Sequence, residues 1–174
     1  GLMDGPIWQQ LALGKAAGLE FAPMVKVLRS FAGLPHRCQW VATVNGISWY
    51  NDSKGTNVGA SVAAITGLGA TGKIILLAGG VGKGAEFKQL AHTMRRYGSR
   101  AILFGEDADK IAAVLADVVP VERVHSLQAA VDCAQALAKT GELVLLSPAC
   151  ASFDMFRNYE HRGEEFTRMA RALA

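Results

Sequence analysis

The sequence predicts an α/β protein built on a mostly parallel sheet flanked by helices, and two observations lead to this fold class. From residue 57 onward, short apolar runs alternate with segments of helical periodicity. The runs IILLA and LVLLS are apolar throughout, which is typical of strands covered on both faces by helices. Repeated strand–helix units of this kind form a Rossmann-like sheet with right-handed crossovers.

The expected elements follow one another in a regular order. A short helical lead-in comes first, with helices over 6–17 and 22–31, and the Gly/Pro-containing string GLPHR ends it. The strings CQWVATV and ISWYND then flank Asn45-Gly46, a two-residue turn signal that predicts an N-terminal β-hairpin. Beyond it, the strands KIILLAG, RAILFG, VERVHS and LVLLSP alternate with helices expected over 57–67, 85–97, 106–117, 127–139 and 154–173.

The segment 127–139 is the clearest of these helices. Ser126 precedes it and is suited to cap its first turn. Its apolar residues recur at helical spacing, which predicts one buried face made of Leu127, Ala130, Val131, Ala134, Leu137 and Ala138. The last helix repeats this spacing at Phe166, Met169, Ala170 and Leu173.

Composition and charge disfavour several classes of protein. The chain is 51% hydrophobic and 19% charged, which is typical of a folded globular domain. Its net charge of +3 comes from scattered basic residues, so we expect no nucleic-acid partner. There is neither an apolar run of about 20 residues nor a signal-peptide pattern, so we expect a cytoplasmic protein with no membrane partner. Cys38, Cys133 and Cys150 form no metal-binding or disulfide pattern, so we expect no metal site and three small, buried apolar side chains.

Three loops of unusual content follow predicted strands, where α/β sheets bind their ligands. NDSKGTN (51–57) concentrates polar groups before a helix N-terminus, which suits an anion; the alternative is a polar turn in which Thr56 caps the helix. AGGVGKG (78–84) combines Lys83 with glycines that let the backbone approach a ligand, although a structural turn explains it equally well. SPACASFDMFRNYEHRGEEF (147–166) predicts a helix N-terminus near Asp154 that presents N–H groups and hydroxyls.

Together, these loops predict a site for a small anionic ligand at one edge of the sheet. Lys54 and Lys83 supply positive charge, and Asp52 could accept from an amine or a ribose hydroxyl. The residues thus indicate a nucleotide- or amino-acid-binding domain without specifying a reaction. A Ser/His hydrolase is disfavoured because no GxSxG elbow is present, and a NAD-dependent oxidoreductase because no GxGxxG follows the first strand.

Four strings between residues 33 and 166 resemble the C-terminal domain of the Mur ligases, and in particular the branch that adds D-glutamate: GLPHR, NDSKGTN, LLAGGVGKG and LLSPACASFDMFRNYEHRGEEF. The DSK-x-TN form favours that branch over its siblings. The resemblance implies that residues 1–34 are the closing helices of a central ATPase domain and that 35–174 are the amino-acid-binding domain. LALGKAAGL is a weaker match, and the start GLMDGPIWQQ matches the family poorly.

The resemblance also implies a reaction in peptidoglycan precursor synthesis. In this family, ATP phosphorylates a carboxylate of the UDP-sugar substrate, and the amine of the incoming amino acid attacks the acyl phosphate. The implied partners are D-glutamate, ATP or ADP, the acyl phosphate of UDP-N-acetylmuramoyl-L-alanine, and the N-terminal and central domains. ATP and Mg²⁺ would serve the full-length enzyme. This stretch lacks the family's GxxGKS/T loop, magnesium ligands and modified lysine, so we expect it to hold neither and to be inactive alone. The alternative is a free-standing binding module without catalysis.

Individual roles follow from the same resemblance. Lys83 is implied as the catalytic residue and as one of the D-glutamate-binding residues, which are Thr56, Lys83, Ser152, Phe153 and Tyr159. The implied nucleotide-binding residues are Arg37, Asp52 and Lys54. The chain departs from the family pattern at three places: Tyr159 replaces the usual Phe, Val81 the usual acidic residue and Gly55 the usual Ala.

Overall fold

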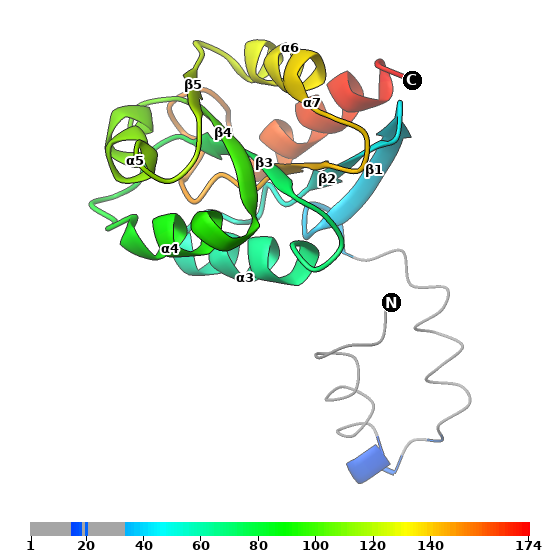
Figure 1. Ribbon diagram of the computed structural model, residues 1–174. Coiled ribbons are helices and arrows are strands. Elements are labelled where there is room, and N and C mark those ends of the chain that lie inside the picture. The colour runs from blue at the N-terminus through cyan, green and yellow to red at the C-terminus, as the bar shows by residue number, and fades with distance from the viewer. Residues whose placement is uncertain (1–14, 19, 21–33) are drawn as a thin grey trace. The chain divides into compact units, whose positions relative to one another are not determined.

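The computed structural model describes residues 15–18, 20 and 34–174 (Figure 1). The chain divides into two units, 1–33 and 34–174, and the second contains all the elements described below. The two lead-in helices predicted over 6–17 and 22–31 lie outside the described residues, apart from residues 15–17, of which Lys15 and Ala16 are helical and Ala17 is in a turn. The assignment of residues 1–34 to a central ATPase domain therefore stays a prediction.

Residues 34–174 form a six-stranded sheet in the order β1-β2-β6-β3-β4-β5. The strands are β1 (Gln39–Val44), β2 (Ile47–Asn51), β3 (Ile74–Gly79), β4 (Gly98–Phe104), β5 (Val121–Arg123) and β6 (Leu143–Leu146). Only β1 and β2 pair antiparallel; every other pair in this sheet is parallel. The predicted fold class, a mostly parallel α/β sheet preceded by a hairpin, is confirmed.

The hairpin turn is formed by the two residues that the sequence indicated. Asn45 and Gly46 both have left-handed backbone angles, with φ of 52° and 77°. Two such residues in succession give the turn whose twist matches that of the flanking strands. The turn therefore joins β1 to β2 as an antiparallel pair, and β2 also pairs with β6, in parallel.

The helices cover both faces of the sheet and create two hydrophobic cores (Figure 1). They are α3 (Val58–Leu68), α4 (Lys88–Tyr97), α5 (Ala108–Leu115), α6 (Leu127–Leu137) and α7 (Tyr159–Arg171). The first three pack on one face and the last two on the other. Successive residues of β3 point alternately into the two cores, so Leu76 contributes to the first and Leu77 to the second.

Three details differ from the sequence-based expectations. The last helix begins at Tyr159 rather than near Asp154, because Asn158 caps it by accepting from the N–H of His161. In the same way Asn57, not Thr56, caps α3. Leu137 was expected on the buried face of α6, but it is the last residue of the helix and is 38% exposed.

The cysteines also depart from expectation. Cys150 is buried, Cys133 is half-buried and Cys38 is exposed. The first β-strand begins at Gln39, directly after Cys38, which lies in the connection that enters the sheet and has a left-handed backbone with φ of 44°. The prediction of a buried Cys38 is therefore wrong, because this residue lies in the connection before β1 and not in the sheet.

Among the residues that the structure describes, no helix is long and apolar enough to cross a bilayer.

Ser126 caps α6 as predicted, since its side chain accepts from the N–H of Ala129 at 3.1 Å. Replacing Ser126 with Ala leaves that N–H without its partner, and we expect a loss of about 1 kcal/mol in the free energy of unfolding. Urea unfolding of the chain measures this loss. Ser126→Asp keeps an acceptor at the same place and should retain the stability; equal losses in both variants would contradict the capping role.

Candidate functional site

The three loops singled out in the sequence meet at the carboxyl ends of β2, β6 and β3, which are neighbours in the sheet. The N–H of Gly79 donates to the carbonyl of Pro148 at 2.9 Å, and Ala149 donates to Gly55 at 2.9 Å. Val81 and Ala151 donate to each other, also at 2.9 Å in both directions. The prediction that these loops gather at one sheet edge is confirmed, and backbone hydrogen bonds hold them together.

Two glycines of the second loop, Gly79 and Gly80, allow the loop to pack closely against neighbouring backbone. Gly79 has a φ of 132°, and a Cβ there would lie 1.7 Å from the carbonyl oxygen of Phe104. Gly80 has a φ of 123°, and its Cβ would lie 2.2 Å from the carbonyl oxygen of Ala151. The close approach expected toward a ligand is thus made, at these two positions, toward the protein's own backbone.

Asp107, which the sequence reasoning missed, fixes the same loop from the end of β4. Its Oδ2 accepts from the N–H of Gly82 at 2.7 Å, and its Oδ1 pairs with Lys110 Nζ at 2.6 Å. The hydrogen bonds from Lys110 and Gly82 hold the pKa of Asp107 below its usual range. A polar residue just after a strand end was the only signal in the sequence. Asp107 therefore helps to hold the loop that carries Lys83.

Arg162 joins the first loop to the third and was also missed. Its guanidinium is fully buried and donates to the hydroxyl of Ser53 at 3.0 Å, to the carbonyl of Ser53 at 2.9 Å and to the carbonyl of Cys150 at 3.2 Å. Burial lowers the pKa of Arg162 to about 10. No sequence pattern indicated the burial of Arg162, because a lone arginine in a helix is usually exposed.

The five residues expected to bind D-glutamate line one cavity of about 300 Å³, at the lower end of the size range of small-molecule sites. Lys83 Nζ lies 5.8 Å from the centre of the Phe153 ring, and Phe153 is 68% exposed at the rim. Three further lining residues were not anticipated as ligand-binding residues. The complete lining is Thr56, Lys83, Ala151, Ser152, Phe153, Asn158, Tyr159 and Glu160.

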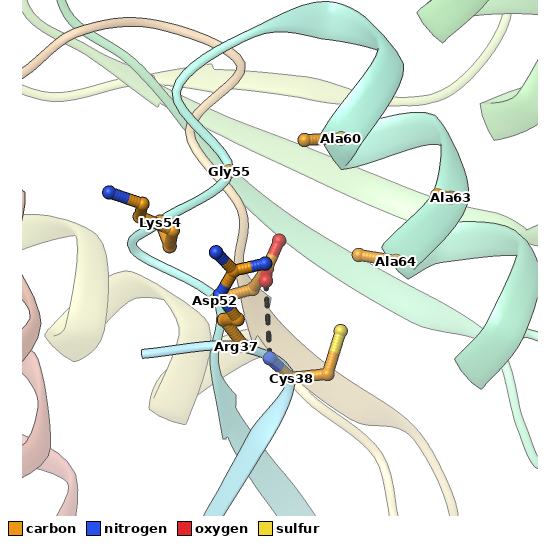
Figure 2. Close-up of a pocket in the computed structure, with 8 residues that line it drawn as sticks. All are labelled: Arg37, Cys38, Asp52, Lys54, Gly55, Ala60, Ala63 and Ala64. Atoms are coloured by element: carbon orange, nitrogen blue, oxygen red, sulfur yellow. Dashed lines mark hydrogen bonds between the residues drawn. The ribbon is translucent and has the colours of Figure 1, made fainter. Parts of the chain in front are cut away.

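The three residues expected to contact the nucleotide line a second cavity, of about 320 Å³ (Figure 2). Figure 2 shows Arg37 beside Asp52, with Ala60 and Ala64 of α3 on the other side of the cavity. One wall is thus charged and the other apolar. The complete lining is Arg37, Cys38, Asp52, Lys54, Gly55, Ala60, Ala63 and Ala64.

Lys54 connects the two cavities. It lines the second cavity, yet its Nζ lies 3.8 Å from the centre of the Tyr159 ring, which lines the first. An ammonium over an aromatic face is attracted by the ring's quadrupole. The two groups of expected site residues are therefore adjacent parts of one surface.

Asp52 is buried, and both of its carboxylate oxygens accept hydrogen bonds from the protein. It is 6% exposed; its Oδ1 accepts from the N–H of Cys38 at 3.1 Å, and its Oδ2 accepts from the hydroxyl of Ser147 at 2.6 Å. A Cβ on Gly55 would lie 2.6 Å from that Oδ2, so the glycine leaves room for this bond. Asp52 thus ties the start of β1 and the end of β6 to the first loop, and it also lines the second cavity.

Burial raises the pKa of Asp52, and the hydrogen bonds from Ser147 and Cys38 offset part of that rise. The folded protein therefore holds this proton more tightly than the unfolded chain, so ionisation of Asp52 costs stability. The cost is absent below the ordinary aspartate pKa of about 3.9 and is complete above the folded-state pKa.

Replacing Asp52 with Asn should remove this pH dependence, because the amide keeps an acceptor for Cys38 and a donor toward Ser147. We expect the free energy of unfolding of the variant, relative to the parent chain, to rise as the pH increases from about 4 through the folded-state pKa. Urea unfolding at a series of pH values measures this. Parallel pH curves for the two proteins would show that the burial of Asp52 carries no such cost.

Over residues 15–18, 20 and 34–174, no three His, Cys, Asp or Glu side chains gather as a metal site requires. The second cavity fits an anion better than a bare cation, because Arg37 and Lys54 line it and Asp52 already accepts hydrogen bonds on both oxygens.

A family model and two related sequences agree on the family to which this chain is similar. The family model for the glutamate ligase domain of the Mur ligases matches residues 36–150. The UDP-N-acetylmuramoylalanine–D-glutamate ligase of Legionella pneumophila strain Lens is 55% identical over 164 residues, covering 93% of this chain and 37% of the relative. The corresponding ligase of Pseudomonas fluorescens strain Pf-5 is 57% identical over 166 residues, covering 94% and 37%. The chain thus spans 37% of the length of these relatives.

Solved structures share the fold at low sequence identity. Escherichia coli FolC in complex with ADP superposes with a TM-score of 0.65 at 20% identity, covering 93% of this chain and 38% of that one. The MurF ligase of Thermotoga maritima in complex with ADP gives a TM-score of 0.56 at 14% identity, covering 94% and 37%. A Yersinia pestis folylpolyglutamate synthase/dihydrofolate synthase complexed with AMPPNP and a Mn ion gives 0.62 at 18%, covering 89% and 35%.

Proposed function

The chain belongs to the Mur ligase family, and on that basis we propose that it is the C-terminal, amino-acid-binding part of a longer ATP-dependent ligase. The proposed enzyme adds D-glutamate to UDP-N-acetylmuramoyl-L-alanine in the cytoplasmic synthesis of peptidoglycan precursors. The names of relatives at 55% and 57% identity support this substrate choice. The share of those relatives that the chain covers supports its assignment as one part of the enzyme.

The observation that carries the proposal is the convergence of all five expected D-glutamate residues on one cavity. D-Glutamate has two carboxylates, and the cavity offers the ammonium of Lys83 and the hydroxyls of Thr56 and Ser152. Hydrogen bonds to a carboxylate from a charged donor are about twice as strong as neutral ones. Lys83 is therefore proposed to bind one carboxylate, with the hydroxyls and the backbone of Ser152 and Phe153 binding the other.

The neighbouring cavity is proposed to contact ATP and then ADP. Arg37 and Lys54 supply two positive charges there, which suit phosphates. Asp52 is proposed to reach a ribose hydroxyl with the lone pairs that Cys38 and Ser147 leave free. The ADP and AMPPNP complexes of structures with this fold support a nucleotide partner for the full-length enzyme.

The proposed chemistry needs the chain mainly to bind and orient the amine. ATP phosphorylates the carboxylate of the UDP-sugar substrate, and the D-glutamate nitrogen attacks the resulting carbonyl carbon. A C–N bond forms, the C–O bond to phosphate breaks, phosphate leaves with the electron pair, and the nitrogen loses a proton. Lys83 would hold D-glutamate in line with the acyl phosphate, and such positioning supplies much of the rate of a reaction between two bound groups.

The partner domains of the full-length enzyme are proposed to supply the phosphate-binding loop and the Mg²⁺ that accompanies ATP. This chain would then bind substrate without turning it over. The lysine of the second loop cannot serve as a Walker A lysine, because Leu77 and Gly84 stand where that motif has Gly and Ser or Thr.

Ligase activity tests the proposal. The full-length ligase should release equal amounts of ADP and phosphate only when ATP, UDP-N-acetylmuramoyl-L-alanine and D-glutamate are all present, and L-glutamate should not substitute. The 174-residue chain under the same conditions should form no amide. Turnover with a different amino acid in preference to D-glutamate would refute the assignment of substrate, and turnover by the chain alone would refute the need for the partner domains.

A further inference from the structure

The cavity lined by Thr56, Lys83, Ser152, Phe153 and Tyr159, which is the proposed D-glutamate cavity, contains two opposite charges that do not pair with each other. Lys83 and Glu160 both line it, yet no salt bridge joins them. Among the described residues, neither side chain forms a salt bridge elsewhere. An ammonium and a carboxylate that share a small cavity without contact leave room for a ligand that carries both charges.

The surroundings of Glu160 favour its charged form. It is half-buried in the first turn of α7, where the helix dipole favours a negative charge. A hydrogen bond from the Tyr159 side chain, with smaller contributions from its own backbone N–H, Lys54 and His36, lowers the pKa of Glu160 below its usual range. Lys54, the neighbouring ammonium, lies against the ring of Tyr159 and forms no salt bridge with Glu160.

We propose that Glu160 binds the α-ammonium group of the incoming amino acid, while Lys83 binds one of its carboxylates. This assignment rests on the proposed function and adds to it the residue that recognises the amine. A site lined only by Lys83 and hydroxyls would accept any dicarboxylate. With Glu160 present, the cavity selects an amino acid over a dicarboxylate of the same length, because the latter would bring only negative charge toward Glu160.

Glu160 is proposed to bind the substrate ammonium and not to act as the base that deprotonates it. It stabilises the ammonium form, whereas the attack on the acyl phosphate requires the free amine. Its removal should therefore weaken the binding of amino acid without slowing the chemical step, so KM should rise and kcat should not fall.

The test compares D-glutamate with glutarate, which has the same two carboxylates and no amine, in the full-length ligase. In Glu160→Gln we expect the KM for D-glutamate to rise about tenfold, as expected for the loss of one charge-assisted contact, and kcat not to fall. Glutarate, measured as a competitive inhibitor, should bind as well as before or better. Glu164→Gln makes the same charge change on the same helix at an exposed residue outside this cavity, and should leave both ligands unaffected.

Equal losses for D-glutamate and glutarate in Glu160→Gln, or no loss for either, would overturn the assignment. So would an equal effect of Glu164→Gln. These results differ from a failure of the proposed function, in which the parent ligase itself would not form an amide with D-glutamate.

Discussion

Replacing Lys83 with alanine in the full-length ligase should raise the free-energy barrier for D-glutamate, as measured by kcat/KM, by about 1.5–3 kcal/mol, or roughly ten- to a hundredfold in rate. Lys83 is the only lysine that lines the D-glutamate cavity in the described part of the chain. Its loss would leave one ligand carboxylate without a cationic partner. The effect should appear mainly in KM if Lys83 only binds, and in kcat as well if it also orients D-glutamate for attack.

The matched control for this experiment is Lys88→Ala. Lys88 lies at the start of α4, its side chain is 83% exposed, and it makes only a long contact of 3.9 Å with Glu86. The control removes the same charge from a site outside the cavity and should leave both kinetic constants unchanged. If Lys83→Ala also kept its KM and kcat, while binding of the other two substrates was normal, Lys83 would have no role in recognising D-glutamate.

The largest loss of stability is expected from Gly79→Ala. The new methyl group would lie 1.7 Å from the carbonyl oxygen of Phe104, and the φ of 132° is one that residues with a Cβ rarely adopt. A side-chain rotation can relieve neither the clash nor the strained φ, because the clash is with the backbone of β4 and φ is itself a backbone angle. We expect the free energy of unfolding to fall by more than about 3 kcal/mol, which is a large part of the 5–15 kcal/mol typical of a domain.

Urea unfolding of the 174-residue chain measures this loss, and Gly67→Ala serves as its control. Gly67 lies inside α3 with nothing within 4 Å of the position of a Cβ, so alanine there should stabilise the chain by up to about 1 kcal/mol. A Gly79→Ala variant as stable as the parent would mean that the end of β3 can move away from β4. It would then follow that the second loop is not held rigidly by this contact.

The strands and the hairpin could be predicted because their signals are local. β3 and β6 are buried along their whole length between two helical layers, and their sequences are apolar throughout. Asn45-Gly46 specifies its turn with two residues. The resemblance to the Mur ligases, carried by strings that form the three loops, is confirmed by the family match over residues 36–150.

The features that could not be predicted depend on contacts distant in sequence. The start of α7 was placed too early because Asp154 looks like a helix cap, whereas its carboxylate accepts from the N–H of Glu106, 48 residues away. The tight packing of Gly79 against Phe104 involves two different strands, so the sequence could not distinguish it from a ligand-binding glycine. The burial of Arg162 likewise depends on Ser53, which is 109 residues away.

The candidate site residues were assigned by resemblance rather than from their chemistry, and their roles stay a prediction. Their types indicated only a small anionic ligand. The structure groups them into two cavities, which meet where Lys54 of one lies against the ring of Tyr159 of the other. Glu160 was not among the residues that the resemblance implied, and it lines the cavity because it follows Tyr159 in the first turn of α7.

A titration of D-glutamate into the 174-residue chain, followed by heteronuclear NMR with L-glutamate as the control, shows whether this cavity forms the amino-acid site. We predict chemical-shift changes confined to Thr56, Lys83 and the segment 152–160, larger for the D isomer than for the L isomer. Unchanged signals for these residues up to tens of millimolar D-glutamate, or changes centred elsewhere in the chain, would contradict the claim that this cavity forms the amino-acid site.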